Sequence, residues 1–102
     1  MADTPVSVIL LDYVAPLTRI DELLAEHRAW LAAQYQAGHF LASGAQVPRT
    51  GGVILARLGR AEAAEIAATD PFALAGAATH QVFEFVPTMG PLADLLESVK
   101  DR

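Results

Sequence analysis

The chain contains no cysteine. Disulfides, thiolate zinc sites and a cysteine nucleophile are therefore excluded. Apolar runs are also short, because none approaches the roughly 18 to 20 residues that a membrane-spanning helix needs. The N-terminal segment lacks the basic and apolar regions of a signal peptide. These absences lead us to expect a cytoplasmic protein without a membrane partner.

Basic residues are few and scattered, since seven Lys and Arg stand against twelve Asp and Glu for a net charge of -5. Nucleic-acid binding depends on clustered basic side chains, so no nucleic-acid partner is expected. Only 19% of the 102 residues are charged, whereas 53% are hydrophobic. We expect a single domain over residues 1–102, part of whose apolar surface meets another chain.

Hydrophobic periodicity predicts the order β-α-β-β-α-β followed by a C-terminal helix. The predicted strands are Val6 to Tyr13, Phe40 to Gln46, Gly52 to Leu58 and Thr79 to Val86. The predicted helices are Thr18 to Ala37, Arg60 to Thr69, a turn or two from Pro71, and Pro91 to Lys100. Thr18 and Asp21 are expected to cap the first helix, and Gly38 to end it. This order is typical of a ferredoxin-like α+β sandwich, in which two helices cover one face of a four-stranded sheet.

The second face of the predicted sheet is also apolar. On the first strand, the residues of one face are Val8 and Leu10, and those of the other are Ile9 and Leu11. Neither face suits water, yet the two helices cover only one of them. We therefore expect a homodimer in which two sheets pack through their open faces. The alternative is a monomer whose C-terminal helix folds over its own sheet.

His27 is the one strongly polar residue on the apolar face of the first predicted helix. Its ring is expected to point inward, where an unpaired polar group costs about 1 to 3 kcal/mol. One interpretation is a core histidine bonded to a backbone carbonyl, and another is a functional pair with an acid. Asp70 is the leading candidate for that acid. As the residue before Pro71, it also suits the cap of the following helical turn.

Other polar motifs are weaker. Neither His39 nor His80 has a histidine partner at i,i+4 spacing, so no bound metal is expected. The Gly51-Gly52 pair lacks the phosphate-loop patterns and predicts a tight turn, with Arg49 at the rim of a pocket. Ser43 either donates a hydrogen bond to a substrate oxygen or marks strand-end geometry.

Segments along nearly the whole chain resemble the YciI-like (YCII-related) family of small dimeric α+β proteins. These segments are Ser7 to Leu11, His27 to Leu31, Gly38 to Ser43-Gly44, Arg49 to Ile54, Ala68 to Phe72, and Ala75-Gly76. In that family a helical His and the Asp of an Asp-Pro-aromatic motif are proposed to form a His-Asp dyad in a pocket, and the resemblance assigns these roles to His27 and Asp70. It also implies a dimeric α+β barrel, and that some relatives act on small oxygenated ring compounds by elimination or isomerisation.

The resulting hypothesis is a lyase or isomerase in which His27 and Asp70 transfer a proton without a metal or cofactor. The candidate substrate-binding residues are Ser43, Gly44 and Phe72, although an aromatic at such a position is often part of the core. No nucleophile elbow or oxyanion-hole motif supports hydrolysis through a covalent intermediate. The alternatives are a ligand-binding or sensor module without chemistry, and a structural dimeric module.

Overall fold

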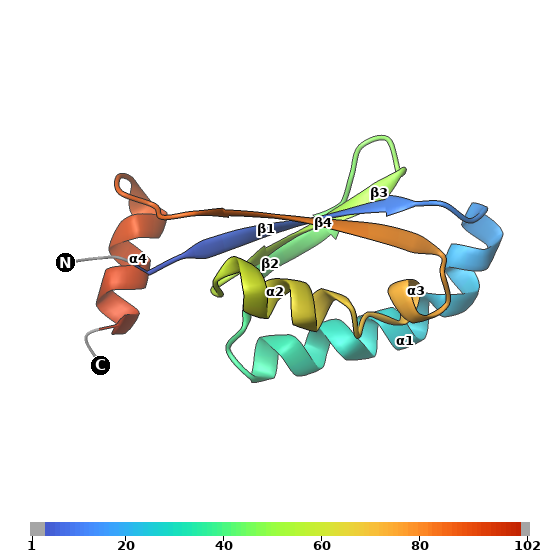
Figure 1. Cartoon of the computed structure of the whole chain (residues 1–102), viewed down its shortest axis with the longest axis horizontal. Helices are drawn as coiled ribbons and strands as arrows, with labels where there is room; N and C mark the ends of the chain where they lie inside the picture. The colour runs from blue at the N-terminus through green and yellow to red at the C-terminus, as the bar shows by residue number, and fades with distance from the viewer. Residues whose placement is uncertain (1–3, 101–102) are drawn as a thin grey trace.

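The computed structural model describes residues 4–100 and has the predicted order of elements (Figure 1). Its strands are β1 (Val6–Tyr13), β2 (Phe40–Ala45), β3 (Gly51–Ala56) and β4 (Ala78–Phe85). Its helices are α1 (Leu17–Gln36), α2 (Arg60–Ala67), α3 (Pro71–Leu74) and α4 (Pro91–Lys100). The prediction of a ferredoxin-like α+β fold is confirmed. No helix within residues 4–100 is long and apolar enough to cross a membrane.

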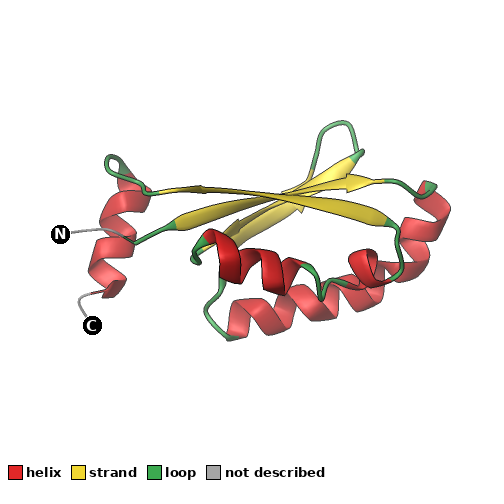
Figure 2. Cartoon of the chain, viewed as in Figure 1, coloured by secondary structure: helices red, strands yellow, loops and turns green. Residues whose placement is uncertain are grey.

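The four strands form one antiparallel sheet in the order β2-β3-β1-β4, with α1, α2 and α3 on one face (Figure 2). Ile9 at the centre of β1 lies opposite Ile54 of β3 and Val82 of β4. Since directly paired residues share a face, these three side chains point toward the helices. There Ile9 is fully buried, together with Ile20 of α1. The core therefore lies between the sheet and this helical layer.

Helix α1 begins differently from the prediction. Pro16, not Thr18, occupies the N-cap position, and no side chain caps the helix. The carbonyl oxygen of Pro16 accepts the first hydrogen bonds from the backbone of the helix. The predicted cap of Thr18 with Asp21 is thus wrong, and the Asp21 carboxylate instead binds Arg49. At the other end, Gly38 has a φ of +80°, which confirms the predicted stop.

Gly51 allows the β2–β3 hairpin to lie close to β1. A Cβ atom at this position would lie 1.8 Å from the backbone oxygen of Leu11, so any other residue would push the two strands apart. The close approach keeps β3 paired with β1 up to Asp12, which lies opposite Gly51. The hairpin is thereby held beside α1, where it forms one wall of a cavity.

The sheet face away from the helices is apolar and uncovered. The register places Phe83 of β4 opposite Val8, and Val53 of β3 opposite Leu10. Phe83 is 54% exposed and Phe85 is 46% exposed. Helix α4 lies at one end of the sheet (Figure 1) and leaves these phenylalanines exposed, so the alternative of a C-terminal helix folded over its own sheet is wrong.

Candidate functional site

Asp70 is a fully buried carboxylate at the start of α3. Its Oδ1 accepts a hydrogen bond of 3.0 Å from the backbone N–H of Phe72, and Pro71 occupies the first position of the helix. This is the capping role that the sequence indicates. One such bond uses only part of the acceptor capacity of a carboxylate, which has about four acceptor sites. The remaining sites are available to other side chains.

Two histidines occupy those remaining sites. Nδ1 of His27, on α1, lies 2.8 Å from Oδ1 of Asp70. Nε2 of His80, on β4, lies 2.9 Å from Oδ2 of the same carboxylate. The structure therefore brings His27 and Asp70 together and adds His80, for which the sequence indicated no role beside Asp70. Within residues 4–100, no group of three or more His, Cys, Asp or Glu side chains is arranged to hold a metal ion.

The charge on Asp70 fixes how the two imidazoles are protonated. Burial raises the pKa of Asp70, but the hydrogen bonds from His27, His80 and the Phe72 backbone lower it by more, so that the net pKa lies below its ordinary value. An ionised carboxylate only accepts hydrogen bonds, so both histidines donate to it. In its neutral form His27 thus carries its proton on Nδ1, which leaves Nε2 as a free acceptor.

Aromatic packing holds the His27 ring in this orientation. Phe72 stacks on the imidazole with the ring centroids 4.1 Å apart and the planes 11° from parallel. The ring centroid of Trp30 lies 5.7 Å from that of the imidazole. The indole Nε1 of Trp30 donates a hydrogen bond of 2.8 Å to the Thr69 hydroxyl. The ring of His27 is therefore fixed by a hydrogen bond and by its aromatic neighbours.

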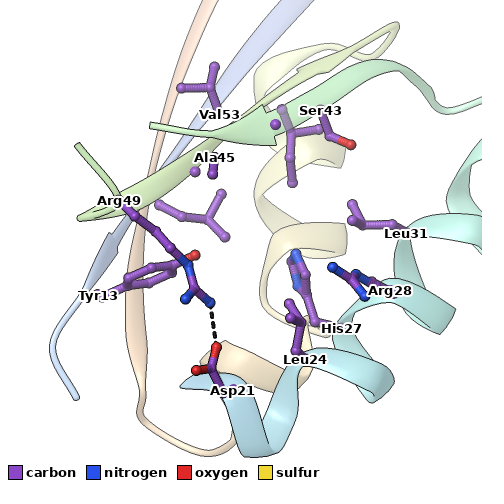
Figure 3. Close-up of a pocket in the computed structure, with 14 residues that line it drawn as sticks. Tyr13, Asp21, Leu24, His27, Arg28, Leu31, Ser43, Ala45, Arg49 and Val53 are labelled. Atoms are coloured by element: carbon purple, nitrogen blue, oxygen red, sulfur yellow. Dashed lines mark hydrogen bonds and ion pairs between the residues drawn. The ribbon is translucent and has the colours of Figure 1, made fainter. Parts of the chain in front are cut away.

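His27 forms part of the wall of a cavity of about 460 Å³ between α1 and the β2–β3 hairpin (Figure 3). This volume is in the range of small-molecule sites, which is about 300 to 1,000 Å³. The lining residues are Leu11, Tyr13, Asp21, Leu24, His27, Arg28, Leu31, Ser43, Gly44, Ala45, Arg49, Gly52, Val53 and Ile54. The buried ring is therefore open to a ligand on its cavity side.

Two of the three predicted substrate-binding residues line the cavity, and the third does not. Ser43 and Gly44 line the cavity, whereas Phe72 is 1% exposed and lies outside the lining, stacked on His27. The hydroxyl of Ser43 is 2.6 Å from that of Tyr35, and either oxygen can be the donor. When Tyr35 donates, the Ser43 hydroxyl is free to donate to a ligand.

His80 borders a different hollow. This second hollow, of about 350 Å³, is lined by Ala78, Thr79, His80 and Val82 of β4 and by four alanines of the α2–α3 segment, Ala64, Ala67, Ala68 and Ala73. His27 and His80 therefore face separate spaces with the Asp70 carboxylate between them. Only His27 meets the larger cavity.

The pKa of Asp70 predicts a specific loss of stability in acid. A carboxyl group with a lowered folded-state pKa stabilises the protein above its ordinary pKa of 3.8, and this contribution is lost as the pH falls through the folded-state value. We expect the free energy of unfolding, measured by urea titration, to fall more steeply below about pH 4 in the native protein than in Asp70→Asn, which cannot titrate. If the free energy of unfolding fell equally steeply with pH in the two proteins, the lowered pKa of Asp70 would be contradicted.

Comparison with known proteins agrees with the resemblance seen in the sequence. Residues 5–86 match the family model of the YCII-related domain. A search among curated proteins gives no match. The matched range contains β1 through β4, and with them His27, Asp70, His80 and the whole cavity wall.

Proposed function

The chain belongs to the YCII-related family, and we propose that it is a lyase or isomerase that moves a proton on a small oxygenated ring compound. His27 is the general acid or base and Asp70 is its partner. One observation carries the proposal. Nδ1 of His27, a residue of the cavity wall, lies 2.8 Å from Oδ1 of the buried Asp70 carboxylate.

The proposed step begins at Nε2 of His27. This nitrogen takes a proton from a substrate C–H bond, whose electron pair stays on the substrate and forms a new double bond. In an isomerisation the new double bond displaces the π pair of a neighbouring double bond, and that pair takes the proton back from the imidazolium at another atom of the substrate. In an elimination the leaving group departs with its own bonding pair, and the imidazolium gives its proton to the leaving group or to water. The Asp70 carboxylate stabilises the imidazolium between these events, and general acid–base catalysis of this kind contributes about 10²- to 10⁴-fold.

His80 serves as a positioning residue in this proposal. It donates to Oδ2 of Asp70 while His27 and the Phe72 N–H occupy Oδ1, so that rotation of the carboxylate would break bonds on both oxygens. The hydrogen bond from His27 thereby keeps its direction, and Nε2 keeps its place beside the cavity. His80 itself does not touch the space in which a substrate would bind.

The cavity complements this chemistry with a mixed wall. Leu24, Leu31 and Ile54 supply apolar surface for a carbon ring, and the Ser43 hydroxyl supplies a donor for a ring oxygen. A mostly apolar pocket with a few polar groups is the usual composition of small-molecule sites.

We expect His27→Gln to slow proton transfer strongly while leaving the fold intact. The test incubates the protein in D₂O with a panel of unsaturated lactones and cyclic enones, each with and without a carboxylate substituent, and follows loss of substrate C–H signals and product formation by NMR. Native protein should exchange or convert a member of the panel, and His27→Gln should be slower by about 10²-fold or more.

His39→Gln is the matched control, because His39 bonds to Gln34 and lies outside the cavity lining. Activity equal to native in His39→Gln is expected. Equal activity in His27→Gln, at a comparable melting temperature, would refute the role of His27. Ligand binding without any exchange or product would favour the non-catalytic binding module instead.

We also propose that the protein is a homodimer formed through the uncovered sheet face. Val8, Leu10, Val53, Leu55, Phe83 and Phe85 give this face an apolar surface that needs no complementary charge. A second copy provides the same surface, and a two-fold axis through the sheet would join the two sheets into the barrel that the sequence resemblance implies. The cytoplasmic location stays a prediction.

A further inference from the structure

The charged residues of the cavity favour an anionic ligand, although the protein as a whole is acidic. Arg28 and Arg49 line the cavity with a single acid, Asp21, so this wall carries one net positive charge when His27 is neutral. The whole chain carries a net charge of -5. A positive cavity attracts anions locally, and the net negative charge of the rest of the protein repels them elsewhere.

In the part of the chain that the structure describes, Arg28 forms no ion pair. The residues three and four positions away on α1 are Leu24, Ala25, Leu31 and Ala32. None of them is acidic, so the helix offers no ion pair at the usual spacing. Among residues 4–100, no Asp or Glu lies within ion-pair distance of Arg28, whereas Arg19 of the same helix pairs with Glu22 at 3.2 Å.

Arg49 is held at the opposite side of the cavity by Asp21 (Figure 3). One guanidinium nitrogen lies 2.6 Å from the Asp21 carboxylate, and this hydrogen bond raises the pKa of Arg49 above its ordinary value. A guanidinium has five N–H donors, so the bond to Asp21 leaves others unused. Arg49 is therefore both positioned and still able to donate.

We infer that the ligand of this cavity is a ring compound that carries a carboxylate, with Arg28 as its principal binding residue. Arg28 follows His27 directly on α1 and both side chains line the same space, so a carboxylate bound by Arg28 places the attached ring beside His27 (Figure 3). Arginine suits this group because its planar fork matches a carboxylate. This inference rests on the proposed function and names the class of its substrate.

The experiment compares an acid with its neutral amide. Binding of 4-hydroxybenzoate and 4-hydroxybenzamide to ¹⁵N-labelled protein is followed by chemical-shift titration at neutral pH. Native protein should bind the acid at least about 10-fold more tightly than the amide, with shifts at residues of the cavity wall. Arg28→Gln should weaken binding of the acid about 10-fold and leave binding of the amide unchanged. Added salt should also weaken binding of the acid to native protein and leave binding of the amide unchanged.

Arg19→Gln is the control, because it removes an arginine from α1 without touching the cavity. Its affinity for the acid should equal that of native protein. The inference is overturned if acid and amide bind equally, if the two arginine variants behave alike, or if neither probe shifts the cavity residues. Proton exchange on neutral ring compounds together with equal binding of acid and amide would overturn this inference alone, whereas binding of the acid without any exchange on the panel would overturn only the proposed function.

Discussion

Asp70→Ala is expected to lower the free energy of unfolding by about 3 to 5 kcal/mol, a range typical of breaking a buried, hydrogen-bonded charge network. The substitution leaves three donors without an acceptor, from His27, His80 and the Phe72 backbone. It also removes the cap of α3. The total free energy of unfolding of a small domain is about 5 to 15 kcal/mol, so much of the stability would be lost. Thermal and urea unfolding at fixed protein concentration measure the change.

Asp70→Asn should be milder, at about 1 to 3 kcal/mol. The asparagine oxygen can replace Oδ1 and accept from His27 and from Phe72. Its amide group would face Nε2 of His80, which can accept once the His80 proton moves to Nδ1. The hydrogen bonds are then kept and only the charge is lost.

Glu65→Ala is the matched control, because Glu65 is an exposed carboxylate on α2. A change within about 0.5 kcal/mol is expected there. If Asp70→Ala were no more destabilising than Glu65→Ala, the buried network would not contribute to the fold as described.

Phe83→Glu is expected to convert a homodimer into a monomer. The native protein should sediment at about twice the protomer mass of 10.8 kDa. Phe83 is 54% exposed on the uncovered face, so a glutamate there leaves the folded protomer intact but places a charge in the proposed interface. A two-fold axis introduces two such charges, and we expect the dissociation constant to rise at least about 100-fold, as measured by sedimentation equilibrium.

Leu74→Glu provides the control for that experiment. Leu74 is 75% exposed on α3, which lies on the helical side of the sheet, so its charge should not affect association. Native protein that sediments as a monomer would contradict the proposed dimer. Equal dissociation constants for the two variants would place the interface elsewhere.

The elements of the fold were predictable because their signals are local. The bounds of β1 and α4 match the predicted Val6 to Tyr13 and Pro91 to Lys100, since both segments have strong periodicity next to clear breaks. The predicted cap at Thr18 was wrong because Pro16, two residues earlier, is the N-cap and accepts the first hydrogen bonds of the helix through its carbonyl oxygen. The bond that engages Asp21 comes from Arg49, 28 residues away, and no local pattern indicates it.

The candidate site was predictable only in part. Helical spacing showed that His27 points inward, and the structure finds it 8% exposed. The role of His80 was missed, because it depends on the register that pairs His80 with Leu11 and on the position of α3. A signal was present, since alternation along β4 puts His80 on the same face as Val82, toward the helices. The position of Phe72 behind His27 is likewise a tertiary contact that spacing alone does not give.

The protonation state of the His27 ring tests the central claim most directly. Long-range ¹H–¹⁵N correlation spectra of the neutral histidine distinguish a protonated ring nitrogen from an unprotonated one. We predict a proton on Nδ1 held by Asp70, a bare Nε2 whose shift moves when a ligand enters the cavity, and loss of this fixed tautomer in Asp70→Ala. A neutral His27 that carries its proton on Nε2 would contradict the account, because no base would then face the cavity.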